Sequence, residues 1–515
     1  MKPTRFVKNT VILTVTSLIL RTVGIVFRIY LSGKIGSEGM GLYQLVISVY
    51  VLASTFATSG ISVAVTRLVA DELVRGTAHS VRHVLRRSLL LGGLLGLVSA
   101  LLFFFGADYI GTRFVDDIRA IPALKMMAFS LPSMGISACL KGYFSARRKV
   151  NYPAISQLLE QAVRIGLIFF IFYRFTALGL EKACLAVMFG DTVAEWLSCL
   201  FVAVSYRRDR RTLQREIPHT HTAQKRPSVV RQLLTIAAPI TAGRYLNSVL
   251  RTVETILVPS RIAQFCGSRE SALSQFGALK GMALPLIFFP ASFLSAMSSL
   301  LIPELSSAAV RDDRDGIRRM TEKSLQVTLG ASILIAAVFT VFAEELGLLF
   351  YNSREVGVYL RVLAPLTPIM YAESIVDGML KGLNQQMRSL TYSVTDSAVR
   401  IVLIWAIVPR QGMGGFLFIM VISNLLTSFL NLGRLLTVTA LRPNWGQTVI
   451  KPLLAAVIAS AGALMLTSCL SKTALPTLAV TGIGIGGLCI FYGFLTYAFG
   501  CAIPLDILRK KGYDR

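Results

Sequence analysis

Long apolar stretches separated by short polar ones follow one another along almost the whole chain. A helix that crosses a bilayer needs about 20 predominantly apolar residues, and fourteen stretches approach that length. They lie at 9–31, 41–62, 88–107, 121–140, 155–173, 183–205, 233–258, 276–302, 324–343, 356–380, 390–409, 413–433, 452–471 and 475–500. The pattern therefore predicts an all-α polytopic membrane protein with about fourteen transmembrane helices.

Composition agrees with the pattern and narrows the class. Of the 515 residues, 54% are hydrophobic and 16% are charged, against about 25% charged in a soluble domain. These values exclude a soluble enzyme, a disordered chain and a fibrous protein. The first stretch is not a cleaved signal peptide, because Arg21 and Arg28 interrupt its apolar core. The seven cysteines show no CxxC spacing, so we expect no disulfide framework and no metal site.

The distribution of Lys and Arg predicts the orientation. Alternate connections, starting with the N-terminus, carry 34 of the 53 basic residues, whereas the opposite set carries ten. Basic residues concentrate on the cytoplasmic side, so both termini are predicted to be cytoplasmic. This bias accounts for much of the net charge of +26 without a nucleic-acid partner.

The two halves of the chain contain an internal repeat. The segment LKGYF followed by EQAVRI in the first half corresponds to LKGLN followed by DSAVRI in the second. Arg21 and Arg28 are seven residues apart, as are Arg244 and Arg251. Corresponding stretches are six spans apart, so the repeats are parallel, which places a transport site between two pseudo-symmetric lobes.

The repeat sets the expected domain boundaries. We expect an N-terminal lobe at 1–206, a basic cytoplasmic linker at 207–232 and a C-terminal lobe at 233–440. Residues 441–515 form an appended helical hairpin, whose two spans carry no charge within their apolar cores, and a cytoplasmic tail. The basic linker either only fixes the topology or also binds anionic lipid headgroups.

Nine basic and seven acidic residues fall within the predicted spans. If all of them faced lipid, they would cost on the order of 40–55 kcal/mol, so most must pair or face water. The basic residues are Arg21, Arg28, Lys125, Arg164, Arg244, Arg251, Lys280, Arg361 and Arg400, and the acidic ones are Glu160, Asp191, Glu195, Glu254, Glu373, Asp377 and Asp396.

The arginines of the first and seventh spans are the predicted substrate-binding residues. A spacing of seven residues is nearly two helical turns, so Arg21 and Arg28 share a face about 10 Å apart, and Arg244 and Arg251 do the same. Guanidinium forks suit phosphate oxygens well. We therefore expect these side chains to line a cavity for an anionic, phosphorylated substrate, the alternative being that they snorkel or cap carbonyl groups.

The remaining charges are candidates for gating or ion coupling. Glu160 with Arg164, and Asp396 with Arg400, have the i,i+4 spacing of ion pairs, which either simply neutralise each other or act in gating. Glu373 and Asp377 are like charges at the same spacing, and they either share a cation or proton or pair with Lys381 and the nearby arginines. Glu254 completes the set of candidates.

Three segments resemble a known family. They are GSEGMGLYQL after the first span, LKGYFSARRKVNYPAISQLLEQAVR across the fourth and fifth, and FGALKGMALPLIFFPASFLSAMSSLLIPELSSA around the eighth. They are similar to the stage V sporulation protein B branch of the multidrug/oligosaccharidyl-lipid/polysaccharide flippase superfamily, which is related to the bacterial lipid II flippases.

The resemblance implies a function in the bacterial cytoplasmic membrane. It implies a V-shaped bundle of two lobes that moves an undecaprenyl-pyrophosphate-linked saccharide, such as a peptidoglycan precursor, to the outer leaflet by alternating access. Arg21, Gly24 and Arg28 match the two arginines flanking a glycine in the first span of the lipid II flippases. The acidic residue that those flippases carry near the start of the second span has no counterpart here. The last two spans would provide a groove for the lipid tail.

Two alternatives remain within the same superfamily. A cation-coupled multidrug antiporter would need an acidic cavity rather than an arginine-rich one, and a flippase could export a different polysaccharide intermediate. An enzyme is not expected, because catalytic carboxylates would need a sizeable outer loop and the outer connections have roughly 3 to 17 residues. We expect no cofactor, with Na+ or H+ as the candidate coupling ion, and a monomer whose partners are a lipid-linked oligosaccharide and the membrane lipids.

Overall fold

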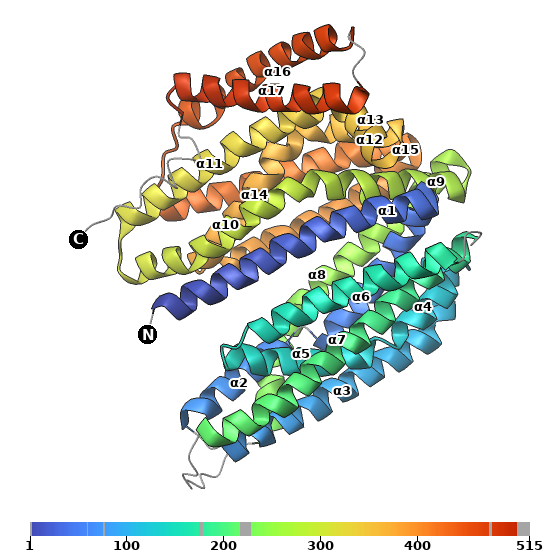
Figure 1. The fold of residues 1–515 in the computed structure, drawn as a ribbon, viewed down its shortest axis with the longest axis vertical. Helices are drawn as coiled ribbons and strands as arrows, with labels where there is room; N and C mark the ends of the chain where they lie inside the picture. Colours follow the sequence, from blue (N-terminus) through green and yellow to red (C-terminus); the bar gives the residue numbers. More distant parts are fainter. Residues whose placement is uncertain are drawn as a thin grey trace. The chain divides into compact units, whose positions relative to one another are not determined.

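The computed structural model describes residues 3–58, 60–75, 78–174, 179–216, 228–472 and 476–501, and every regular element within these ranges is a helix (Figure 1). Contacts within the chain separate two compact units, at 1–260 and 261–515. We call them the first and the second unit. The predicted lobe and linker boundaries stay predictions.

The first unit contains seven α-helices, the start of an eighth and one short π-helix. They are α1 (Pro3–Thr58), α2 (Ile61–Arg75), α3 (Ala78–Tyr109), η1 (Ile110–Phe114), α4 (Ala120–Ala128), α5 (Leu131–Ala146), α6 (Asn151–Arg174), α7 (Leu180–Glu216) and most of α8 (Val229–Cys266). Its buried core includes Val65, Leu85, Tyr143 and Leu213, which belong to four different helices.

The second unit contains the other helices. They are α9 (Arg269–Phe276), η2 (Gly277–Ala283), α10 (Leu284–Val310), α11 (Arg314–Val341), α12 (Ala343–Tyr351), α13 (Arg354–Leu363), η3 (Ala364–Leu366), α14 (Thr367–Gly382), α15 (Gln386–Thr439), η4 (Gly446–Ile450), α16 (Lys451–Leu470) and α17 (Thr477–Ala498). The last two pack side by side as the expected hairpin (Figure 1).

Two glycines join helical arms that the sequence predicts as separate spans. The stretches 9–31 and 41–62 fall largely within α1, which kinks at Gly36 with φ 69°. The stretches 390–409 and 413–433 both lie in α15, which kinks at Gly412 with φ 55°. Glycine populates positive φ readily, whereas a residue with Cβ does not. Helical hydrogen bonding therefore continues almost to the bend, and each pair of spans forms one bent helix.

Nine helices among the described residues are long and apolar enough to cross a bilayer, or ten when the bent pair α4 and α5 counts as one span. Two of the nine, Thr14–Val74 with 61 residues and Gln386–Thr439 with 54, are each long enough for two crossings of about 20 residues. Twelve of the fourteen predicted spans overlap these helices or the bent pair, and the exceptions are 233–258 and 356–380. The prediction of an all-α polytopic membrane protein is confirmed.

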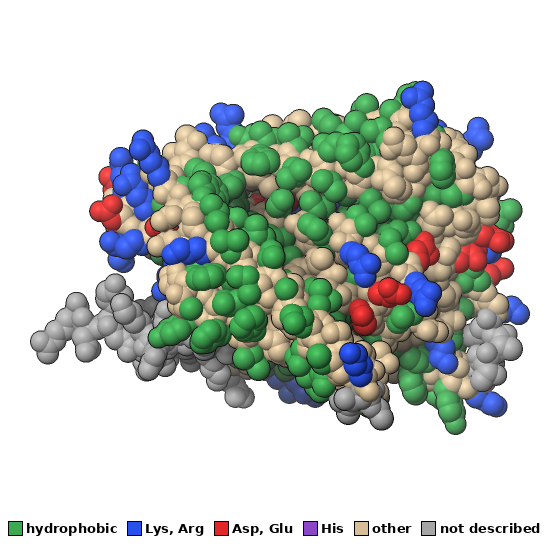
Figure 2. All heavy atoms as spheres, turned by 90° about the horizontal axis from the view of Figure 1, so that it is seen from above, with side chains coloured by type: hydrophobic (Ala, Val, Ile, Leu, Met, Phe, Trp, Pro, Cys, Tyr) green, Lys and Arg blue, Asp and Glu red, His purple; other side chains and the backbone are tan. Residues whose placement is uncertain are grey.

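The exposed faces of α16 and α17 carry large hydrophobic side chains. On α16 and α17, large hydrophobic side chains such as Val457, Met465, Ile490 and Phe494 are more than half exposed. Figure 2 shows a face of the protein on which hydrophobic side chains cover much of the area. A surface of this kind is stable in contact with acyl chains rather than water.

Candidate functional site

The arginines of α1 lie on its first arm, before the kink at Gly36. Arg21 is exposed and Arg28 is half-buried. The ring of Tyr30 lies 5.4 Å from that of Phe169, which fixes this arm against α6. Arg28 is also within electrostatic range of the Tyr43 hydroxyl on the second arm. The side chain of Arg28 is therefore close to the interior of the first unit.

The arginines of α8 belong to the same unit, and both are exposed. The hydroxyl of Thr252 donates a hydrogen bond of 3.1 Å to the carbonyl of Ser48, and the ring of Tyr245 lies 6.0 Å from that of Phe56. This part of α8 therefore packs along the second arm of α1. The prediction that Arg21, Arg28, Arg244 and Arg251 line one cavity stays a prediction.

Arg164 on α6 binds two carboxylates, one on its own helix and one on α7. Its Nη2 lies 3.0 Å from Glu160, one turn earlier on α6, as the sequence predicts. Its Nε lies 2.5 Å from a carboxylate oxygen of Asp191 on α7. Asp191 is buried. The predicted pair is therefore part of a triad with Asp191. The local spacing around Glu160 and Arg164 does not predict this third member.

A further carboxylate follows one turn later on α7. Glu195 is 9% exposed, and no hydrogen bond or ion pair to it is found within the part of the chain that the structure describes. It lies within electrostatic range of Glu160, Lys141 and Arg164. The i,i+4 spacing of Asp191 and Glu195 puts both on one face of α7. This spacing is the feature of the sequence from which their proximity could have been predicted. We call Lys141, Glu160, Arg164, Asp191 and Glu195 the α6–α7 charge cluster.

The corresponding pair in the second unit is bridged by a serine. Arg400 Nη2 lies 2.5 Å from Asp396, one turn earlier on α15. Its Nε donates to the hydroxyl of Ser423 at 2.9 Å, and that hydroxyl donates to Asp396 at 2.5 Å. Ser423, on the second arm of α15, therefore binds both members of the pair.

Asp377 pairs with Lys381, and the separation is 2.5 Å. The hydroxyl of Ser389 also donates to Asp377 at 2.8 Å. Of the two alternatives for Glu373 and Asp377, the pairing with lysine is therefore realised for Asp377. Glu254, the remaining coupling candidate, is buried on α8 with 5% exposure. No group of three or more His, Cys, Asp or Glu side chains positioned to hold a metal ion is found among the described residues.

Glu373 lines an apolar cavity of about 290 Å³ in the second unit. Its walls come from α11, α14, α15, η4 and α16, and they include Leu329, Phe429, Trp445 and Leu453. The rest of its lining is almost entirely hydrophobic. A cavity with these walls suits a hydrocarbon chain.

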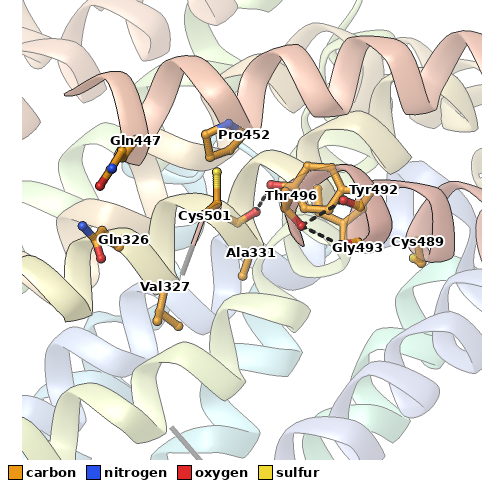
Figure 3. A pocket seen from close by; sticks show the side chains of 12 residues that line it. Gln326, Val327, Ala331, Gln447, Pro452, Cys489, Tyr492, Gly493, Thr496 and Cys501 are labelled. Carbon is orange, nitrogen blue, oxygen red and sulfur yellow. Dashed lines mark hydrogen bonds between the residues drawn. The ribbon is translucent and has the colours of Figure 1, made fainter. Parts of the chain in front are cut away.

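A second cavity of about 180 Å³ lies between α11 and the last two helices (Figure 3). Tyr492 of α17 crosses to α11 and donates a hydrogen bond of 2.7 Å to the carbonyl of Gly330. Thr496 donates to the carbonyl of Tyr492 at 2.9 Å. The appended hairpin is therefore attached to α11 by a buried tyrosine and encloses apolar space beside it.

Comparison with known proteins identifies related chains. A family model described as polysaccharide biosynthesis protein matches residues 6–308, and a second one, MatE, matches residues 236–406. Stage V sporulation protein B of Bacillus subtilis (strain 168) is 27% identical over 409 residues, 79% of this chain and 79% of that one. The lipid II flippase MurJ of the same strain is 20% identical over 419 residues, 78% of this chain and 76% of that one.

A solved structure shows the same fold. The lipid II flippase MurJ in an inward closed conformation is similar with a TM-score of 0.70 and 14% identity, over 94% of this chain and 98% of that one. Together with the sequence matches, this similarity confirms the resemblance to the stage V sporulation protein B branch and to the lipid II flippases.

Proposed function

Because the chain belongs to the polysaccharide biosynthesis protein family, we propose that it is a flippase for an undecaprenyl-pyrophosphate-linked saccharide. The cargo is a peptidoglycan precursor such as lipid II, and it moves from the cytoplasmic to the outer leaflet by alternating access. The names of the relatives, a lipid II flippase among them, support this cargo class. Flipping breaks and forms no covalent bond, so the protein acts as a transporter and not as an enzyme.

The observation that carries the proposal is the exposure of arginines within apolar helices. Arg21, Arg244 and Arg251 are exposed, and Arg28 is half-buried. A guanidinium that faced acyl chains near the bilayer centre would cost about 2.5–3.5 kcal/mol. An aqueous path that carries an anion removes this cost. The pyrophosphate of the cargo offers several oxygens to guanidinium forks.

The apolar cavity beside Glu373 supports a site for the lipid part of the cargo. Its walls include Trp445, Val449 and Leu453 from the helices that lead into the C-terminal hairpin. A polyprenyl chain gains about 25 cal/mol for each Å² of apolar surface that it buries. The cargo would thus be bound at two places, with its charge on arginines and its tail on apolar helices.

An excess of carboxylates in the first unit supports coupling to a proton. Among the described residues, the α6–α7 charge cluster contains three carboxylates and two cations. A buried charge without a partner is costly, so one carboxylate of the cluster takes up a cation. A proton suits Glu195 better than Na+, because Arg164 and Lys141 lie nearby and repel a metal ion.

The alternative is a cation-coupled multidrug antiporter. Two observations support it, the MatE match at 236–406 and the α6–α7 charge cluster. Such an antiporter binds cationic drugs, which four arginines would repel. A flippase for another polysaccharide intermediate would share every feature described above. The arginines therefore favour a phosphorylated cargo. Whether that cargo is lipid II is tested by direct transport measurements.

The proposal is tested by transport of defined lipids. Proteoliposomes that contain the purified protein are loaded with labelled lipid II, with undecaprenyl pyrophosphate or with a cationic dye, and the fraction of each that reaches the opposite leaflet is measured. Flipping of lipid II at least tenfold above empty liposomes is expected. Transport of the dye without lipid II would establish the antiporter instead. In cells, expression is expected to restore growth of a strain depleted of its lipid II flippase.

A further inference from the structure

Asp209, near the end of α7, is the centre of a second group of charges. It is 4% exposed. The hydroxyl of Tyr143 donates to its Oδ2 at 2.8 Å, and Arg147 places Nε 3.2 Å from the same oxygen. Lys149 Nζ lies 2.5 Å from Oδ1, which also accepts a bond of 3.3 Å from Arg147 Nη2. Both oxygens of Asp209 are therefore already occupied by donors from α5 and the turn that follows it.

Arg82 of α3 adds a guanidinium that is not among the hydrogen-bond or ion-pair partners of Asp209. Arg82, Arg210 and Asp209 are all within electrostatic range of the Tyr206 hydroxyl, and the ring of Tyr206 lies 5.1 Å from that of Tyr143. The Nε and Nη2 atoms of Arg82 are buried, and neither has a hydrogen-bond partner among the described residues. Two adjacent donors of the Arg82 guanidinium are thus buried without a partner, in a region that also contains Arg210 and Asp209.

Basic groups outnumber acidic ones around Asp209 in the part of the chain that the structure describes. The ion pairs of Asp209 and the electrostatic neighbours of Tyr206 include one carboxylate, that of Asp209, and four cations, which are Arg82, Arg147, Lys149 and Arg210. Buried donors without partners cost about 1–3 kcal/mol each, and more when they are charged. The excess charge and the unpaired fork are both relieved by an anion with several oxygens, which is the chemistry of a phosphate group.

The depth of this group matches the headgroup region of a bilayer. Arg82 precedes the apolar run at 88–107 by six residues, about 9 Å of helix. Asp209 follows the run at 183–205 by four residues, about 6 Å. The polar headgroup layer extends about 5–8 Å beyond each side of the hydrocarbon core. Asp209 therefore lies within this layer, and the backbone of Arg82 lies about 1 Å beyond it, which its long side chain can span.

We propose that Arg82, with Arg147, Lys149 and Arg210, binds the phosphate of an anionic phospholipid headgroup such as phosphatidylglycerol. A lipid fits better than a soluble phosphate because of the residues that follow Arg82 on α3. Leu90, Leu94 and Leu97 are 48–61% exposed and offer a surface for acyl chains. By the distribution of basic residues, the lipid belongs to the cytoplasmic leaflet. The site is separate from the arginines of α1 and α8, so the proposal does not depend on the cargo.

Binding of defined lipids to the purified full-length protein tests the site. Native mass spectrometry and thermal unfolding in neutral detergent are carried out with phosphatidylglycerol, with phosphatidylcholine and with inorganic pyrophosphate. The variant is Arg82→Gln. Its matched control is Arg86→Gln, which removes one exposed arginine from the same helix one turn later.

We expect phosphatidylglycerol to bind the wild type and to raise its unfolding temperature more than phosphatidylcholine does. Arg82→Gln is expected to weaken that binding about tenfold, the effect of losing about 1.4 kcal/mol from a charge-assisted bond, while Arg86→Gln changes it less than twofold. Arg82→Lys, which keeps the charge but loses the fork, is expected to fall between them and serves if Arg82→Gln does not fold.

Two results would overturn the proposal. One is phosphatidylglycerol binding by Arg82→Gln and Arg82→Lys with wild-type affinity, and the other is equal stabilisation by phosphatidylcholine. A response to pyrophosphate that depends on Arg82, without a response to phosphatidylglycerol, would reject the lipid and assign the same phosphate site to a soluble anion.

Discussion

The Nε of Arg164 on α6 lies 2.5 Å from a carboxylate oxygen of Asp191 on α7. In the second repeat the same atom of Arg400 contacts the hydroxyl of Ser423 instead. The two repeats thus preserve an arginine that binds the neighbouring helical segment, and in the first unit the atom bound there belongs to a buried carboxylate. The three carboxylates and two cations of the α6–α7 charge cluster are the physical basis on which we propose proton coupling in the first unit.

Replacing Asp191 with Asn should destabilise the first unit. The change leaves Arg164 with Glu160 alone, and removing one partner of a buried ion pair costs about 3–5 kcal/mol. Because the Arg164 side chain is 24% exposed and keeps Glu160, we expect a smaller loss, about 2 kcal/mol. Thermal unfolding in detergent measures it. Asp312→Asn, at a pair with 79% and 82% exposed side chains, is the control and should leave the unfolding temperature unchanged.

Replacing Glu195 with Gln should remove the pH dependence of transport. Glutamine resembles the protonated carboxyl group, so the variant is fixed in one charge state while the wild type alternates between two. We expect the initial flipping rate of the variant to be at least tenfold lower and constant between pH 6 and 8. Asp396→Asn, in the ion pair of Asp396 and Arg400 on α15, is the control, and its pH profile should keep the wild-type shape. A Glu195→Gln profile like that of the wild type would contradict the coupling role.

Replacing Arg28 with Ala should abolish flipping while the protein still inserts into the membrane. The variant loses a forked donor for the pyrophosphate, worth about 1.5–3 kcal/mol, or a factor of about 10 to 100. Arg28→Lys retains the charge and should keep part of the activity. The exposed Arg113→Ala, near the end of α3, controls for the loss of one positive charge. Full flipping activity by Arg28→Ala would remove the arginine from substrate binding.

Replacing Gly36 with Ala should impair the bend of α1 through the backbone alone. A Cβ at this position would meet no atom within 4 Å, but φ is 69° and ψ is −176°, a backbone region open almost only to glycine, which costs a residue with a side chain about 1–3 kcal/mol. Gly33→Ala, three residues earlier, also meets no atom within 4 Å and is free of this strain. Thermal unfolding and flipping should therefore fall for Gly36→Ala only. An equal effect of both substitutions would assign the cause to something other than φ.

Cysteine labelling checks the predicted orientation. In a variant without the seven native cysteines, a thiol at Lys34, in the first outer connection, should react with an impermeant maleimide on intact cells. A thiol at Arg208, near the end of α7, should react only after permeabilisation. Both positions are exposed. The reverse pattern would invert the topology and move the proposed lipid site to the outer leaflet.

The sequence predicts the helices and their i,i+4 pairs because both depend on local spacing. Glu160 with Arg164 and Asp396 with Arg400 pair as their spacing indicates. Contacts that cross between helices leave no such mark. Asp191 therefore has no visible role in the sequence, although its spacing from Glu195 places both on one face of α7. The continuity of α1 through its bend is likewise not evident in the sequence, which predicts two separate spans, because nothing but the conformation of Gly36 distinguishes a bend from a loop.

The kink at Gly36 makes the first arm of α1 a lever. Arg21 lies 15 residues from the kink, about 22 Å along the helix. A rotation of about 20° at this one residue would move its guanidinium by about 8 Å, while the second arm stays anchored to α8 through Ser48. Because this displacement is perpendicular to the arm, a single pair of backbone torsions would shift an anion bound at Arg21 sideways by about 8 Å, without any helix having to unfold.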